Sequence, residues 1–161
     1  MAQPIKELTF LHNDVEFATH LTHDQDTFIH SHSFYEFFYV TEGAIIHIQN
    51  GQKSVLQTGD MFLLRPNDIH SFERIGECTH RDIIFSKTLF ERAANFLSPT
   101  LLEEINQKVY SIHLHITTEQ ICYLENLLNF AKYMSPSVEA NKPYLVNSIL
   151  AHLLGYLYIS D

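Results

Sequence analysis

Cysteine is scarce in this sequence. Two cysteines, Cys78 and Cys122, occur among 161 residues, and together they match no metal-binding or redox spacing. Disulfides belong to oxidising compartments, so this usage favours an intracellular protein in which both cysteines are buried free thiols.

Basic residues are few as well. Ten Lys and Arg residues stand against 19 Asp and Glu residues, which gives a net charge of -9 at pH 7. No three basic residues are consecutive. Because neutralisation of phosphates dominates nucleic acid affinity, we expect no direct DNA binding by these residues.

Long apolar runs are also lacking. Residues 1–10 contain no run suited to a signal peptide, and no stretch approaches the ~20 apolar residues of a membrane span. We therefore expect a cytoplasmic protein without membrane contact. Hydrophobic residues nevertheless make up 45% of the chain, with 12 Phe and 8 Tyr, which is enough for the core of one folded domain.

The first half of the chain has the pattern of short strands separated by turns. Asn50-Gly51 lies between two strand-like runs and predicts a two-residue type I′ hairpin, in which both turn residues need a positive φ. Gly59-Asp60 and residues 66–68 mark further turns. This spacing predicts a β-sandwich or barrel over residues 1–86.

Residues 87–161 have helical patterns instead. Ser98-Pro99 predicts a helix start with proline in the first position. Residues 117–120 have capping-box spacing and open a second apolar repeat that reaches Ala131. Residues 135–137 (Ser-Pro-Ser) end that helix, and Asn141 with Pro143 opens the last one. We expect a β domain followed by a helical pair that packs with the barrel as one unit.

The last predicted helix carries a wide apolar stripe. It consists of Val146, Ile149, Leu150, Leu153, Leu154 and Leu157. The stripe is wider than a two-stranded seam needs. We expect one side to pack on the preceding helix and the other to pair with a second subunit, which predicts a homodimer.

The 11 histidines are a high count, and four polar residues form a candidate metal site. His30 and His32 are two residues apart, so on a strand they point to the same side, and Glu36 keeps that parity. A turn at residues 66–68 brings the strand of His70 alongside. Imidazole and carboxylate groups that converge can hold zinc or a similar divalent ion. The alternative is that these residues line a pocket as hydrogen-bonded, metal-free side chains.

This layout resembles the two cupin motifs. The segment from His30 to Gly43 matches H-x-H-x3-E-x6-G without a gap, and His70 lies eleven residues after Gly59, as in G-x5-P-x-G-x2-H. Inside the second motif, Arg65 replaces proline and Asn67 replaces glycine, and asparagine tolerates a left-handed backbone. The resemblance implies a mainly β fold: a cupin barrel, also called a double-stranded β-helix or jelly roll, followed by C-terminal α-helices.

The spacing of the first motif occurs a second time at His113, His115 and Glu119. There the capping box places Glu119 on a helix, and Asn126 stands where the motif has glycine. We therefore interpret His113 and His115 as partly exposed strand histidines.

A longer resemblance covers residues 10–160. The segments HSHSFYEFFYVTEG, GDMFLLRPNDIHSFE and RDIIFSKTLFERA, followed by helices, resemble the sensing domain of AraC-family transcription regulators, and within that family the chitobiose-type regulators. The resemblance implies an effector bound in the barrel and helices that pair two subunits. It also implies DNA binding through a helix-turn-helix segment that is not among these residues.

On this basis the preferred function is a sensor that binds a small molecule, with a carbohydrate as the candidate. The residues expected to line its pocket are His30, His32, Glu36, Phe38 and His70. The alternative function is a metal-dependent cupin enzyme, an oxygenase or isomerase, that uses the same metal ligands with an open coordination position.

Two other groups of residues allow two interpretations each. The aromatic run over residues 34–39 stacks on a sugar ring or forms core on both faces of a sheet. Arg65 and Arg74, at the rim of the barrel, pair with an anionic effector or with acidic residues of the protein, and we favour the second.

Overall fold

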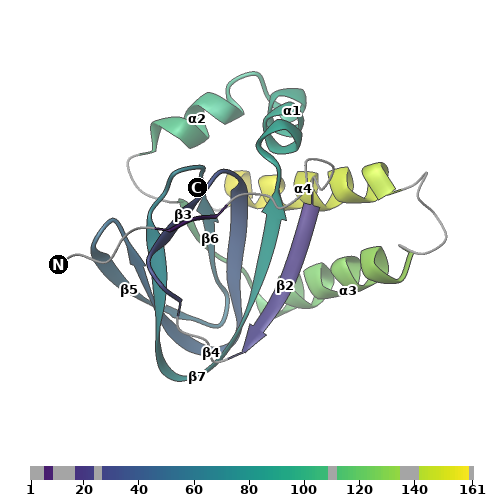
Figure 1. The fold of residues 1–161 in the computed structure, drawn as a ribbon. Coiled ribbons are helices and arrows are strands. Elements are labelled where there is room, and N and C mark those ends of the chain that lie inside the picture. The colour runs from purple at the N-terminus through teal and green to yellow at the C-terminus, as the bar shows by residue number, and fades with distance from the viewer. Residues whose placement is uncertain (1–5, 9–16, 24–26, 109–111, 135–141, 160–161) are drawn as a thin grey trace.

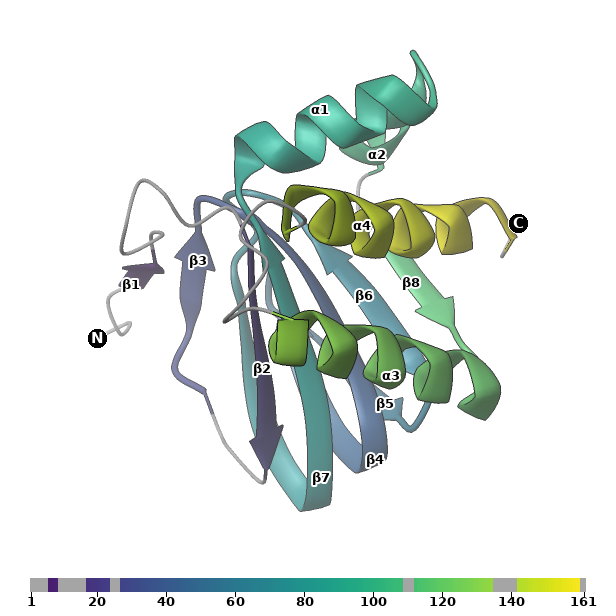
Figure 2. The ribbon, with the colours of Figure 1, turned by 90° about the vertical axis from the view of Figure 1, so that its right-hand side faces the viewer.

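The computed structural model describes residues 6–8, 17–23, 27–108, 112–134 and 142–159, which form a curled sheet with helices on one side and at one end (Figures 1 and 2). One eight-stranded sheet contains β1 (Lys6–Leu8), β2 (Phe17–His23), β3 (His30–His32), β4 (Tyr35–Gln49), β5 (Gln52–Gln57), β6 (Asp60–Leu64), β7 (His70–Phe85) and β8 (Ile112–His115). The helices are α1 (Lys87–Leu97), α2 (Leu101–Gln107), α3 (Thr118–Met134) and α4 (Lys142–Ile159). The predicted mainly β architecture with C-terminal helices is confirmed.

The two longest strands, β4 and β7, determine the curvature of the sheet. They pair antiparallel, and the register shifts between residues 40 and 42 and again between 43 and 45. Such bulges bend a strand and increase its twist. The first part of β4 therefore pairs with β6, while its second part pairs with β5, and the sheet closes around an interior.

Alternation along β4 divides its side chains between two cores. Phe38 and Val40 belong to a buried cluster inside the barrel. Tyr35, Phe37 and Tyr39 point to the other face and pack in the larger cluster with the helices. The aromatic run therefore forms core on both faces, with each of these side chains almost fully buried.

The turns adopt the backbone that the sequence predicts. Asn50 and Gly51 have φ values of 50° and 81°, and the residues that flank them pair directly, as in a two-residue hairpin. Asn67 has a φ of 71°, so asparagine adopts the left-handed conformation at the glycine position of the motif. The Asn67 N–H donates to the His32 carbonyl at 2.9 Å, which fixes this turn against β3.

The described residues contain four helices, which is more than the predicted helical pair and one more than the three helix starts that the sequence predicts. Helix α1 was not predicted; it begins after Ser86, whose side chain accepts a hydrogen bond from the Leu89 N–H at 3.2 Å. The N-cap of α2 is Thr100, so Pro99 precedes this helix and is not its first residue. Pro99 is exposed and lies before the N-cap, where its missing N–H removes no helical hydrogen bond. Proline is therefore compatible with the turn between α1 and α2.

The capping box of α3 is confirmed. The Gln120 N–H donates to Thr117 Oγ1 at 3.3 Å, and the Thr117 N–H donates to Gln120 Oε1 at 2.7 Å. Glu125 on the same helix accepts hydrogen bonds from the Tyr39 hydroxyl at 2.7 Å and from Arg81 Nε at 3.0 Å. Tyr39 and Arg81 are register partners on β4 and β7, so α3 is tied to the outer face of both strands.

The apolar stripe of α4 is buried within the chain. The stripe residues Val146, Ile149, Leu150, Leu153 and Leu154 are each at most 7% exposed, and Leu157 packs against the same core. Helix α4 lies between α1 and α3 and contacts both, which covers both sides of the stripe (Figure 2). The expectation that one side stays free for a second subunit is therefore wrong.

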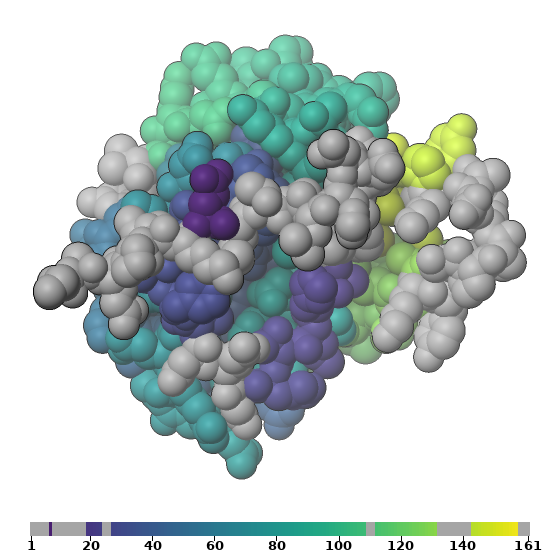
Figure 3. All heavy atoms as spheres, viewed as in Figure 1, coloured from purple at the N-terminus to yellow at the C-terminus, as the bar shows by residue number. Residues whose placement is uncertain are grey.

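The all-atom view shows α1 and α2 at the top and α3 and α4 on the right (Figure 3).

The second half of the chain also contributes a strand. β8 pairs antiparallel with β6, which confirms the strand predicted around His113. The Ser-Pro-Ser break at residues 135–137 and the predicted helix start at Asn141 lie outside the described residues. The division of the chain at residue 86 stays a prediction.

Both cysteines are free, but only Cys78 is buried. Cys122 is exposed because its neighbours Ile121 and Leu124 occupy the inward face of α3, so the prediction of a buried thiol is wrong for Cys122. Within the described part of the chain, the helices are too short or too polar to cross a membrane.

Candidate functional site

The candidate ligands come from three strands that meet inside the barrel. His30 and His32 lie on β3, Glu36 is the second residue of β4, and His70 is the first residue of β7. His30 and His70 are direct register partners. All four side chains are buried, although they are polar.

Three of the four residues form one compact group. His32, Glu36 and His70 each present a ligand atom within 4.8 Å of those of the other two. His32 Nε2 and Glu36 Oε2 are 3.4 Å apart. His30 lies beside this group, with its ring centroid 4.2 Å from that of His70.

Backbone carbonyls orient two of the imidazole rings. His32 Nδ1 donates to the Phe34 carbonyl at 2.8 Å, and His30 Nδ1 donates to the Phe28 carbonyl at 2.9 Å. A neutral imidazole that donates from Nδ1 has its lone pair on Nε2. This arrangement is the one that orients histidine ligands in metal sites, where the second nitrogen is held by a carbonyl or carboxylate.

Burial favours the neutral forms of the groups at this site. Burial lowers the pKa of His32 to about 4 and also lowers the pKa of His70, so both rings are neutral at pH 7. Burial, with Asp82 close by, raises the pKa of Glu36 well above its usual value. The Nε2 lone pair of His32 therefore faces the Glu36 carboxyl group, and either the proton that Glu36 retains or a cation between the two groups satisfies this lone pair.

The buried atoms without partners fit a bound divalent ion. His32 Nε2 and both ring nitrogens of His70 have no hydrogen-bond partner among the described residues. A buried polar atom without a partner costs about 1–3 kcal/mol. Two or three imidazoles with one carboxylate are a ligand set that zinc and similar ions accept.

The barrel interior contains further polar residues that the sequence analysis missed. His47 and His80 are both 2% exposed, and burial lowers the pKa of each to about 4. Asp82 lies near both Glu36 and His80, and burial raises its pKa to about 7. On β7, the alternation of side chains over residues 81–85 indicates that Asp82 shares a face with Ile84, whereas His47 faces inward only because the bulges shift the parity of β4.

The remaining predicted residues lie away from the buried group. Phe38 is inside the barrel and packs on Phe72 at a ring distance of 4.4 Å. Arg65 forms an ion pair with Asp68 at 3.3 Å and donates to carbonyl groups at the end of α2, so its partner is an acidic residue of the protein, as we favoured. Arg74 Nε donates to the Gly76 carbonyl at 3.2 Å.

Residues 14–115 match the family described as the AraC-like ligand binding domain. The chain belongs to this family. The match contains every residue of the buried group, and the predicted family and effector-sensing function are confirmed for this domain.

Curated relatives of this AraC-type domain are longer proteins. The HTH-type transcriptional activator RhaS of Yersinia pestis is 28% identical over 133 residues, which are 80% of this chain and 47% of that protein. RhaS of Yersinia pseudotuberculosis matches to the same extent. The chain therefore spans about half the length of these relatives.

Among solved structures, apo ToxT K231A from Vibrio cholerae has a TM-score of 0.59 and 11% identity, covering 92% of this chain and 60% of that chain. This similarity shows a shared fold over nearly all of the AraC-type domain, helices included. A cupin protein from Bacteroides fragilis has a TM-score of 0.43 and 19% identity, covering 45% of this chain and 68% of that chain.

Proposed function

We propose that this domain senses a small polyhydroxylated effector, such as a carbohydrate, inside the barrel, with a divalent ion held by His32, Glu36 and His70 and with His30 alongside. The observation that carries the proposal is the group of buried polar atoms without partners. When bound, the ion supplies open coordination positions for oxygen atoms.

The interior supports a hydroxyl-rich effector. His47 Nε2, His80 Nδ1 and Asp82 Oδ1 are buried and have no hydrogen-bond partner among the described residues, in addition to the nitrogens of His70. A hydroxyl group both donates and accepts, so a polyol satisfies such a mixed set. The aromatic run supports stacking on a sugar ring less, because all of its aromatic side chains are already buried among other residues of the protein.

We further propose that the domain binds its effector without turnover. Membership in a family of ligand-binding domains supports the sensor over the metal-dependent enzyme considered above. We also propose that the full-length regulator contacts DNA through a segment outside these 161 residues, because the net charge of -9 opposes phosphate binding by this domain.

A thermal-shift screen of saccharides tests the effector proposal. At least one saccharide is expected to raise the melting temperature by several degrees, because a ligand that binds only the native state stabilises it. His80→Ala, which leaves the predicted ion ligands unchanged, should reduce that shift. If only ligands of other chemical classes raise the melting temperature, the carbohydrate part of the proposal fails while the proposed binding site in the barrel stands.

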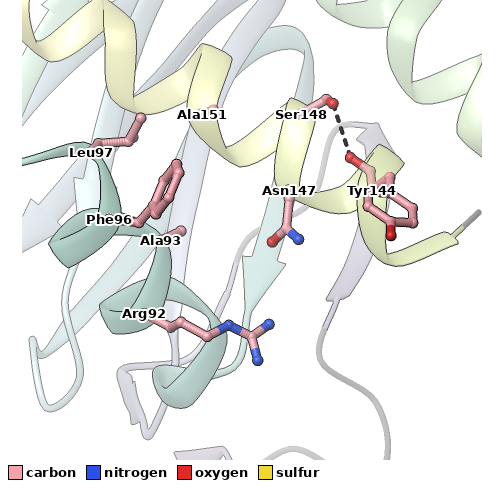
Figure 4. Close-up of a pocket in the computed structure, with 8 residues that line it drawn as sticks. All are labelled: Arg92, Ala93, Phe96, Leu97, Tyr144, Asn147, Ser148 and Ala151. Atoms are coloured by element: carbon pink, nitrogen blue, oxygen red, sulfur yellow. Dashed lines mark hydrogen bonds between the residues drawn. The ribbon is translucent and has the colours of Figure 1, made fainter.

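The proposed homodimer has to use surfaces other than the buried stripe. A groove of about 480 Å³ lies between α1 and α4, and Phe96, Leu97 and Tyr144 are among the residues that line it (Figure 4). Phe96 is 88% exposed and Tyr144 is 74% exposed. Exposed apolar side chains that gather beside a groove are typical of protein interfaces, so we propose that a second copy pairs here.

Light scattering at ~100 μM is expected to give the mass of a dimer. At this concentration a dimer with micromolar affinity is populated. Phe96→Asp should give a monomer, because a charge would be buried in the interface. Phe130→Asp is the matched control, since Phe130 is 53% exposed on α3, and it should remain dimeric. A monomeric wild-type protein at this concentration would refute the dimer.

A further inference from the structure

A second group of metal-ligating side chains lies outside the barrel interior, where β6 meets β8. His113 Nε2 is 3.0 Å from Asp60 Oδ1, and His115 Nδ1 is 3.3 Å from the same oxygen. Asp60 and His115 are direct register partners, and His113 is two residues before His115 on the same face of β8. Two imidazoles from one strand therefore converge on a carboxylate of its neighbour.

Neighbouring groups keep all three side chains near one another but leave the two exposed imidazoles room to turn. A Cβ at Gly59 would lie 2.6 Å from Cε1 of the His115 ring, so the ring occupies space that only glycine leaves open. The His113 ring stacks on Phe62 at 4.5 Å. The Gln57 N–H donates to the second Asp60 oxygen, Oδ2, at 2.7 Å, which leaves Oδ1 for the histidines.

Both histidine–carboxylate distances suit coordination by a transition metal, whereas the two imidazoles have to turn toward each other to share one ion, because only the barrel residues among the described ones already form a group of three ligands within 4.8 Å. Two atoms bound at about 2.0–2.1 Å in a tetrahedral site are about 3.3 Å apart, close to both histidine–carboxylate contacts. The His113 and His115 side chains are 51% and 68% exposed, so their nitrogens can be reached from solvent and can rotate toward a common ion. Although partial burial acts to raise it, the hydrogen bonds from Gln57 and both histidines keep the pKa of Asp60 below its ordinary value.

We propose that Asp60, His113 and His115 form a surface site for a divalent transition metal ion such as Zn²⁺, Ni²⁺ or Cu²⁺. The site is distinct from the barrel group, because ring contacts through Phe62 and His47 separate His113 from His70. A bound ion would join β8, which follows α2 in the chain, to β6 of the barrel. Glu119, which completes the repeated sequence motif, lies on α3 and is not part of the proposed ligand set.

Immobilised Ni²⁺ tests the proposal, because a resin reaches exposed histidines and not those inside the barrel. Untagged wild-type protein is expected to be retained and to elute only with imidazole. The double variant H113Q/H115Q should elute at a clearly lower imidazole concentration. The matched control is H20Q/H23Q, which removes two exposed histidines from β2 and should elute like the wild type.

A Zn²⁺ titration by calorimetry gives a second readout. H113Q/H115Q and Asp60→Asn should each weaken one binding event by at least about tenfold, since even outer-shell partners of metal ligands contribute that much. His70→Ala should leave this event unchanged, which separates it from ion binding in the barrel. Equal retention of H113Q/H115Q and wild type, together with an unchanged titration, would overturn the proposal.

Discussion

His70→Ala is expected to abolish binding of the divalent ion that we propose for the barrel, which wild-type protein should contain at about one per chain. His70 offers two buried nitrogens that no other described residue satisfies, and it lies within 4.8 Å of ligand atoms on His32 and Glu36. Removing it leaves only His32 and Glu36 of the compact group, and these are too few to hold zinc, since His30 lies outside that group. Elemental analysis of protein purified without chelator or affinity tag measures the difference.

The stability of the protein gives an independent measurement of the same change. At an ion concentration of 100 times Kd, binding stabilises the native state by about 2.7 kcal/mol. For a domain of this size that corresponds to roughly 5–10 °C in melting temperature. Added zinc should raise the Tm of wild-type protein by about this amount and should leave that of His70→Ala unchanged.

His47→Ala is the matched control, because His47 is also buried in the barrel with an unpartnered Nε2 but lies outside the compact group. It should keep the ion. All variants are best made in an H113Q/H115Q background, so that ions on the outer surface do not contribute. Wild-type protein with less than ~0.1 ion per chain, unchanged by dialysis against zinc, would leave these residues only a pocket-lining role.

Gly43→Ala is expected to destabilise the protein by more than about 3 kcal/mol. A Cβ at this position would lie 2.0 Å from the Glu77 carbonyl oxygen, and Gly43 has a φ of +80°, which side-chain-bearing residues rarely adopt. The clash is with backbone of the paired strand β7, so no side chain can move to relieve it. The bulge that curls β4 would have to rearrange.

Gly76→Ala provides the matched control for this change. Gly76 lies on β7 close to the same bend, but an added Cβ meets nothing within 4 Å and the backbone is not left-handed. Its effect should stay within about 0.5 kcal/mol. Urea unfolding of both variants measures the difference, and similar midpoints for the two would show that the close approach at Gly43 is not required.

The local sequence determined much of the site and of the fold. The spacing of His30, His32 and Glu36 sets their shared side of the sheet, because side chains on strands alternate with a period of two. The turn before His70 was predictable because asparagine and glycine are the residues that accept a left-handed backbone, and Asn50-Gly51 and Asn67 adopt it. The capping box of α3 depends only on residues three apart, and it formed as predicted.

Other features depended on contacts between distant parts of the chain. The bulges around Gly43 exchange inward and outward positions, so Phe38 and Val40 face inward before them and Ile45 and His47 after them. A one-residue shift moves every later side chain of the strand to the opposite face of the sheet. The position of this shift is fixed by the close approach of β7 to Gly43. The polar lining from His47 to Asp82 was therefore set by tertiary structure.

The helices also show which contacts the local sequence cannot predict. The stripe of α4 has the pattern of an interface, but a pattern records only which face is apolar and says nothing of what covers it. Helix α1 and helix α3 cover it from both sides, and both are placed by their own packing on the sheet. The sequence by itself determined the candidate ligands, the turns and the apolar faces, since these follow from local geometry. Only the tertiary structure decided which polar residues share the interior and which apolar surface remains exposed, because both depend on partners far away in the chain.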